Sequence, residues 1–263
     1  MKKMWNSFKI AVSMYSKLPV PKSEWTEENI SHAFIFFPWM GALIGFIVYG
    51  VFKLKEWCLA GEYGISGMTF TVLMVLVPVG ITGGIHMDGF LDTQDALSSY
   101  QEKERRLEIL KDPHTGAFAV MSCAVYLLCI VGIYASFGER SARSAAFGFM
   151  LSRTLSALSV LTFPKAKKSG LAAAFSDSAS KKTVKAVLVC YLAVLCPAMM
   201  AAGRESGAAA VLAAAAVYAY YRRMSLRNFG GITGDLAGYF LQMCELWMAA
   251  AAVGAEIMKA CLG

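Results

Sequence analysis

Long stretches free of charged side chains alternate with short charged segments along the whole chain. Three runs contain no Asp, Glu, Lys or Arg: Asn29–Phe52, Tyr63–Met87 and Pro113–Gly138. Four further apolar runs follow: Ser144–Pro164, Ala186–Gly203, Ser206–Tyr221 and Leu236–Ala255. Because about 20 residues of helix cross the ~30 Å hydrocarbon core of a bilayer, this pattern predicts an all-α, polytopic membrane helix bundle of about seven transmembrane helices. The fifth and sixth runs are shorter and rich in Ala, so they predict either a tilted pair of spans or one re-entrant hairpin.

The positive charges between these runs predict how the bundle is oriented. Alternate segments, starting with the N-terminal one, hold 18 of the 25 Lys and Arg residues; the intervening segments hold 6, and Arg153 lies inside the fourth run. Lys and Arg accumulate in the cytoplasmic loops of multi-pass proteins. The charges therefore predict a cytoplasmic N-terminus and cytoplasmic loops at 86–115, 165–185 and 222–231.

The composition is typical of a membrane protein, and it also indicates which class of partner to expect. Hydrophobic residues make up 57% of the 263 positions and charged residues only 16%, whereas soluble domains are usually about 25% charged. No segment resembles a linker, so one membrane-embedded domain over 1–263 is expected. The net charge of +7 is explained by the loops between spans, so the expected partner is the lipid bilayer and not nucleic acid. The oligomeric state stays open, with a homo-oligomer as one option.

The densest polar cluster follows the second apolar run. Asp88, Asp92 and Asp95 are spaced i, i+4 and i+7, which places them on one face of a helix. Carboxylates stacked in this way repel one another, and the cost rises where they lose water. A cation bound by oxygen ligands would remove that cost, and Mg²⁺ prefers such ligands together with phosphates. The alternative is a solvated acidic helix start that the helix dipole favours.

Small residues and a histidine flank the acidic cluster. Gly83, Gly84 and Gly89 would allow a ligand to approach the backbone closely, which favours a binding site. His86 can orient a substrate through a hydrogen bond or contact a phosphate, and an ordinary histidine at the membrane interface is the other interpretation.

A second polar element precedes the third run. Lys111 can hold a phosphate, and Asp112 can cap a helix or bind a ligand, just before a turn marked by Pro113 and Gly116. A plain turn between two helices is the alternative interpretation of the same residues.

Two further runs carry charges at membrane depth. Arg153 lies in the middle of the fourth run, where an Arg is costly unless it faces a polar interior. A phosphate or a carboxylate such as Asp88 or Asp235 would explain it, and a purely structural ion pair is the alternative. Asp235 opens the last run on the same side as Asp88, whereas Glu245 lies about 15 Å further along a helix. Glu245 is therefore expected to pair with a cation on a neighbouring helix.

With these residues in view, the chain resembles the cobalamin synthase family, the adenosylcobinamide-GDP ribazoletransferases. The resemblance covers most of the chain and rests on an ordered set of motifs: Ser16–Pro21, Phe37–Gly41, Gly83–Asp95, Lys111-Asp112 with Gly116, Ser152-Arg153 and Thr233–Asp235. Three positions depart from the family pattern, namely Ala96, Pro113-His114 and Ala119. The departures leave the acidic motif intact and put in doubt any role for residues 113–119.

The resemblance implies a membrane transferase that joins adenosylcobinamide-GDP to α-ribazole or its 5′-phosphate and releases GMP, with Mg²⁺ required. It also implies site roles: Asp88, Asp92 and Asp95 bind Mg²⁺, and Asp235 completes the site or acts as base. Arg153 and Lys111 would hold phosphate oxygens. The Lys-rich loop 165–185 would recruit the anionic nucleotide or simply reflect the orientation of the bundle.

Two other functions remain as alternatives. A CDP-alcohol phosphotransferase also places Asp-rich motifs at a membrane face, but its D-x-x-D-G-x-x-A-R pattern is absent from the sequence. A transporter of a corrinoid or a cation would also carry Asp and Arg within spans. Against a transporter, the polar residues cluster at one face and no inverted repeat is apparent.

Overall fold

The computed structural model describes residues 2–166 and 181–262 of the chain. These ranges are helical apart from short connections and one isolated β-bridge between Lys165 and Ile232. The helices are α1 (Lys2–Tyr15), α2 (Glu27–Ala60), α3 (Gly67–Thr82), α4 (Ile85–Ser98), α5 (Lys103–Ile109), α6 (Ala117–Ala135), α7 (Glu139–Thr162), α9 (Lys181–Gly203), α10 (Glu205–Phe229) and α11 (Gly234–Leu262). The all-α, polytopic class predicted from the apolar runs is confirmed.

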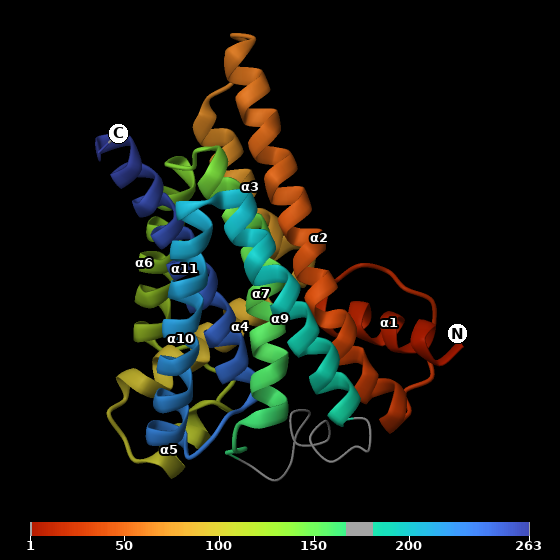
Figure 1. The fold of residues 1–263 in the computed structure, drawn as a ribbon. Helices are drawn as coiled ribbons and strands as arrows, with labels where there is room; N and C mark the ends of the chain where they lie inside the picture. Colours follow the sequence, from red (N-terminus) through yellow and green to blue (C-terminus); the bar gives the residue numbers. More distant parts are fainter. Residues whose placement is uncertain (1, 167–180, 263) are drawn as a thin grey trace.

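The long helices run up and down one bundle (Figure 1). In the described part of the chain, α2, α6, α7, α9 and α11 are each long and apolar enough to cross a membrane, and α3 with α4 would make a sixth crossing if that bent pair is one span. The lower end of the bundle in Figure 1 holds the starts of α2, α9 and α11 and the ends of α7 and α10. The alternating directions agree with the order of apolar runs read from the sequence.

Two of the predicted spans differ from the helices observed. The run Tyr63–Met87 is not one helix, because α3 ends at Thr82 and α4 leaves it at an angle of 94°. The fifth and sixth runs form two separate helices of 23 and 25 residues, α9 and α10. Helix α10 is not among the five apolar helices, and its last turns carry Arg222, Arg223 and Arg227.

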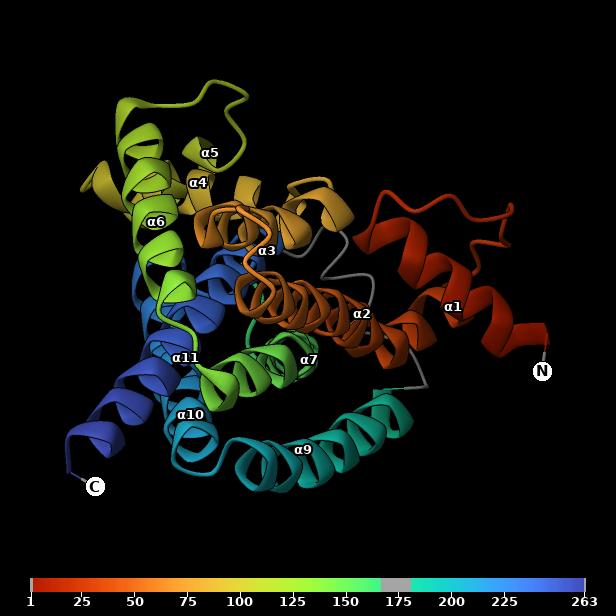
Figure 2. The ribbon, with the colours of Figure 1, turned by 90° about the horizontal axis from the view of Figure 1, so that it is seen from above.

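Helix α7 lies at the centre of the bundle and packs against α2, α9, α10 and α11 (Figure 2). Small residues make these close contacts possible. A Cβ atom on Gly41 or Gly45 of α2 would lie 2.1 Å from the carbonyl oxygen of Phe149 or Ala146 on α7. The two backbones therefore touch directly, as is typical of helices that pack in lipid.

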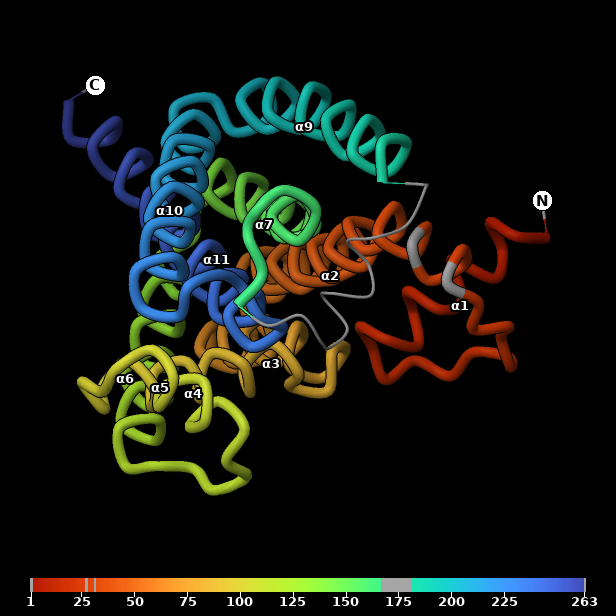
Figure 3. Tube along the Cα trace, turned by 90° about the horizontal axis from the view of Figure 1, so that it is seen from below, coloured from red at the N-terminus to blue at the C-terminus, as the bar shows by residue number. Residues whose placement is uncertain are grey.

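Helix α1 lies outside the bundle (Figure 3), beside the lower half of α2 in the view of Figure 1. The backbone N–H of Lys17, just after α1, donates to the carbonyl of Ile81 at 2.8 Å, which ties the end of α1 to the end of α3. On the other side, Ile232 exchanges backbone hydrogen bonds with Pro164 and Ala166, and so fixes the start of α11 against the end of α7. Residues 167–180 of the Lys-rich loop lie outside the described residues.

Candidate active site

The acidic helix α4 owes its direction to two glycines. Gly83 and Gly84 have φ angles of +65° and +81°, a left-handed conformation that side chains disfavour. The turn ends α3 and starts α4 without a side-chain cap. A Cβ on Gly83 would lie 2.4 Å from the side chain of Lys17, whereas Gly84 faces open space. The glycines are thus needed for the bend, and Gly84 also leaves room for a ligand.

Helix α4 crosses the start of α11 at very short range. A Cβ on Gly89 would lie 2.7 Å from the backbone oxygen of Asp235, and a Cβ on Gly238 would lie 3.0 Å from that of His86. Gly89, expected to leave room for a ligand, instead allows α11 to approach α4. This crossing brings Asp235 to the acidic face, as the sequence predicts from the side on which α11 begins.

Four carboxylates influence one another at this crossing. Asp88 is exposed, while Asp92, Asp95 and Asp235 are partly buried. We treat α4 as lying outside the membrane-spanning segments, because it turns away from α3 and carries three Asp. Burial and then repulsion by Asp88, Asp235 and Asp95 raise the pKa of the Asp92 carboxyl to about 6. The site therefore concentrates negative charge where a cation would be stabilised.

Asp95 is held by the residue that precedes α6. Its Oδ2 accepts a hydrogen bond of 3.0 Å from the backbone N–H of Gly116, immediately before α6. A Cβ on Gly116 would collide with the Asp95 carboxylate at 2.2 Å. Asp95 thus joins α4 to α6. In residues 2–166 and 181–262, no three His, Cys, Asp or Glu side chains converge as a ready-made set of metal ligands.

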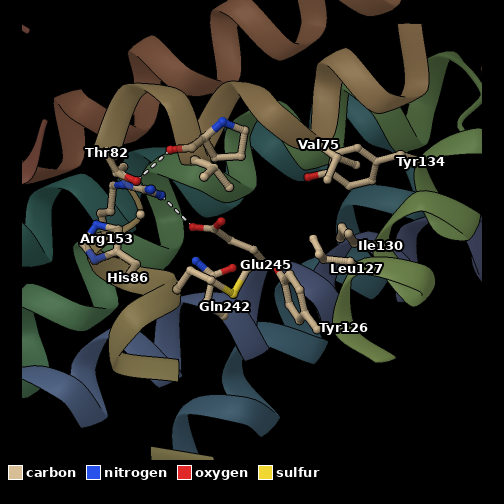
Figure 4. Close-up of a pocket in the computed structure, with 14 residues that line it drawn as sticks. Val75, Thr82, His86, Tyr126, Leu127, Ile130, Tyr134, Arg153, Gln242 and Glu245 are labelled. Atoms are coloured by element: carbon tan, nitrogen blue, oxygen red, sulfur yellow. Dashed lines mark hydrogen bonds and ion pairs between the residues drawn. The ribbon is translucent and has the colours of Figure 1, made fainter. Parts of the chain in front are cut away.

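The intramembrane charges form a buried pair deeper in the bundle (Figure 4). Arg153 Nη1 donates to Glu245 Oε1 at 2.6 Å, and the two side chains are 1% and 7% exposed. Ser152 Oγ donates to the same oxygen at 2.8 Å. The partner of Arg153 is therefore Glu245 on α11, not Asp88 or Asp235, which corrects one expectation and confirms that Glu245 pairs with a cation.

His86 lies between this pair and the acidic face. Its side chain is 6% exposed, and within the described residues its Nε2 atom has no hydrogen-bond partner. Burial, and then the positive charge of Arg153, lower the pKa of the His86 ring. His86 and the Arg153–Glu245 pair line a cavity of about 20 Å³, which is large enough for a water molecule.

The turn that contains Lys111 and Asp112 is exposed. The Asp112 carboxylate accepts a 3.0 Å bond from the backbone N–H of His114 and contacts the His114 ring at 2.7 Å, and these hydrogen bonds lower the pKa of Asp112. Asp112 thus stabilises the turn that leads to Gly116. The bond between Gly116 and Asp95 joins this turn to the site.

Sequence reasoning assigned no role to several residues that line the site. Tyr15, Phe34 and Phe37 line a cavity of about 200 Å³ together with His86, Asp88 and Asp235. A more open cavity of about 600 Å³ holds Ser16, Lys17 and the two glycines of the bend, and Asp88 lines it as well. Phe37 and Lys17 belong to the motifs that carry the family resemblance, which was the available signal. Their contribution depends on how α1 and α2 pack beside α4.

Comparison with known proteins identifies the family to which this chain belongs. A family model described as cobalamin-5-phosphate synthase matches residues 7–253. A relative from Lachnoclostridium phytofermentans, named adenosylcobinamide-GDP ribazoletransferase, is 43% identical over 97% of this chain and 95% of its own length. Relatives of the same name from Clostridium botulinum and Geobacillus are each 30% identical over 94% of this chain, and 96% and 95% of their own lengths are covered. No solved structure matches the chain. The chain belongs to the cobalamin-5-phosphate synthase family.

Proposed function

We propose that this protein joins adenosylcobinamide-GDP to α-ribazole, or to its 5′-phosphate, and releases GMP, in a Mg²⁺-dependent step of cobalamin synthesis. The family and the names of its relatives support this activity. The structural observation that carries it is the crossing of α4 and α11, which places Asp235 against the acidic face of Asp88 and Asp92. Transfer at a phosphate needs such a site, because its catalysis consists mainly of positioning and of neutralising charge.

The reaction makes one bond and breaks one bond at phosphorus. A hydroxyl oxygen of the ribazole bonds to the phosphorus that is linked to cobinamide, while the bond from that phosphorus to the oxygen of the departing GMP breaks. The hydroxyl proton must leave as the new bond forms. We assign its removal to Asp235, whose carboxylate lies at the start of α11 beside α4 and lines the same cavity as Asp88.

The donors at the acidic face fit Mg²⁺. Asp88 and Asp92 offer oxygen atoms under mutual repulsion, and Asp95 offers the oxygen that Gly116 does not use. Mg²⁺ commonly takes one or two protein carboxylates and completes its shell with waters and substrate phosphates, so three converging side chains are not required. When bound, the ion would neutralise phosphate charge during transfer.

The basic residues have different proposed tasks. Lys111 is exposed and can hold a phosphate oxygen at the rim of the site. Arg153 Nη1 is paired with Glu245 in the bundle interior, while its buried Nε has no hydrogen-bond partner among the described residues. We assign Arg153 to positioning α7 against α11 and not to contact with a phosphate. His86, buried with an unpartnered Nε2, can orient a substrate group.

The distribution of Lys and Arg supports an orientation for the site. Acidic helix α4 and its following turn belong to a segment rich in Lys and Arg, as does the N-terminal segment. We propose that the site faces the cytoplasm from the inner membrane of a bacterial-type cell.

A direct assay tests the activity. Purified protein in detergent, supplied with adenosylcobinamide-GDP, α-ribazole 5′-phosphate and Mg²⁺, is expected to release one GMP for each corrinoid product formed. Replacing Mg²⁺ by excess chelator is expected to abolish release. A folded protein that releases no GMP with either form of ribazole would contradict the proposed function. Turnover that continues in chelator would contradict the metal requirement alone.

The crossing at Gly89 gives a matched test of geometry. Gly89→Ala introduces a Cβ only 2.7 Å from the backbone oxygen of Asp235, so the start of α11 must move away from α4. Because small displacements of reacting groups are costly, GMP release is expected to fall by about 10-fold or more. The control is Gly80→Ala on α3, where a Cβ meets nothing within 4 Å. Equal rates for the two variants would show that the crossing does not position the site.

A further inference from the structure

The cavity of about 200 Å³ beside Asp88 has two chemically different ends. Asp88 and Asp235 form the polar end, at the crossing of α4 and α11. Aromatic rings form the other end: Tyr15 from the last turn of α1, Phe34 and Phe37 from α2, and His86 from α4. A ligand that fills it must therefore combine a flat apolar group with a polar group at a fixed distance.

The aromatic end is a continuous set of ring contacts. The centroids of Tyr15 and Phe37 are 4.0 Å apart, those of Phe37 and His86 are 5.9 Å apart, and those of Tyr15 and His86 are 6.5 Å apart with planes inclined by only 28°. Rings in this arrangement offer faces and edges to a planar ligand. The His86 ring turns towards Tyr15 and Phe37, and both of these line the cavity.

His86 supplies an independent sign that a ligand belongs here. It is 6% exposed, and its Nε2 has no hydrogen-bond partner among the described residues. Leaving a buried polar atom without a hydrogen-bond partner destabilises the folded protein. A ligand atom that forms a hydrogen bond with Nε2 would remove this destabilisation. The same bond would fix the orientation of the ligand's ring.

On the basis of the proposed function, we infer that this cavity is the subsite for the heteroaromatic base of ribazole, with the attacking ribose hydroxyl placed at Asp88 and Asp235. The base stacks on Tyr15 and Phe37, and its ring nitrogen pairs with His86 Nε2. The base and the hydroxyl belong to one molecule, which matches a cavity with an aromatic end and a carboxylate end.

The other planar group in the reaction, guanine, fits this cavity poorly. Guanine carries several donors and acceptors on its edges, and burying them without partners is costly. Away from Asp88 and Asp235, the polar side chains of the wall are His86, Ser156 and Tyr15, and the remaining side chains are apolar, among them Phe34, Val160 and Leu241. The more open cavity on the Lys17 side of Asp88 suits the anionic diphosphate instead. The two cavities meet at Asp88, where the reacting groups must meet.

A comparison of Michaelis constants tests the assignment. Tyr15→Ala is expected to raise the KM for ribazole by about 10-fold or more, because it removes an aromatic contact, and to change the KM for adenosylcobinamide-GDP by less than about 2-fold. The matched control is Phe46→Ala, an aromatic residue of α2 that is 78% exposed on the outside of the bundle, for which both constants are expected to stay unchanged. A larger effect on the corrinoid substrate, or equal effects on both, would overturn the subsite.

Inhibition of the wild-type protein gives a second test that needs no variant. Benzimidazole is expected to compete with ribazole and not with adenosylcobinamide-GDP, and guanosine is expected not to compete with ribazole. Competition between guanosine and ribazole would assign the cavity to the nucleotide and overturn the inference while GMP release still supports the function. Absence of GMP release by folded wild-type protein would instead remove the proposed function on which the inference rests.

Discussion

Asp88→Ala and Asp92→Ala are each expected to lower GMP release by about 10³-fold while the protein stays folded. Each change removes an oxygen ligand from the acidic face, and loss of one charge-stabilising group typically costs about 10²–10³ in rate. The Mg²⁺ concentration needed for half-maximal activity is expected to rise in both variants. The measurement is the initial rate of GMP release as a function of Mg²⁺ concentration.

A carboxylate outside the site provides the control for these variants. Glu104→Ala removes an exposed carboxylate of α5, so its rate and Mg²⁺ dependence are expected to equal those of the wild type. If Asp88→Ala and Asp92→Ala retain wild-type rates and the same Mg²⁺ dependence, the function can stand but the acidic face is not its metal site.

The largest loss of stability is expected from Glu245→Leu. This change leaves the Arg153 guanidinium, 1% exposed, without the carboxylate that accepts its 2.6 Å hydrogen bond. Removing one partner of a buried ion pair commonly costs about 3–5 kcal/mol, because the other charge remains buried and uncompensated. The expected result is a decrease of that size in the free energy of unfolding, measured by denaturant titration in detergent.

The double variant Arg153→Met with Glu245→Leu separates charge from packing. Replacing both partners by apolar residues is expected to recover most of the lost stability, since no unpaired charge remains. If the double variant is as unstable as Glu245→Leu alone, side-chain packing and not the buried charge accounts for the loss.

Sequence alone was sufficient for the helical class and for the acidic face. The spacing of Asp88, Asp92 and Asp95 predicts a shared helix face, and α4 confirms that these residues lie on one helix. The start of the last apolar run predicts that Asp235 reaches the same side, and the contact of its backbone with Gly89 confirms this. The first inference depends only on helix periodicity, and the second depends only on the direction of each run. Both can be derived from the order of residues in the sequence.

Other features needed the packing of distant segments. A run free of charge does not reveal that Gly83 and Gly84 bend it by 94°, because both residues are as apolar as their neighbours. The sequence favours a partner for Arg153 among the carboxylates near the membrane surface, whereas the structure pairs it with Glu245, which lies ten residues after Asp235 and at the depth of Arg153. The aromatic cavity combines Tyr15, Phe37 and His86 from three helices, and no periodicity within one helix can indicate it.

The contact between Gly89 and Asp235 also bears on how the protein is made. The two residues are separated by more than half of the chain, and chains are inserted from the N-terminus as they are synthesised. The acidic face of α4 therefore lacks Asp235 beside it until α11 has been synthesised, although Gly116 can already bind Asp95. The candidate site is thus completed last, and a chain truncated before residue 234 is expected to contain every earlier helix and to lack the crossing of α4 and α11.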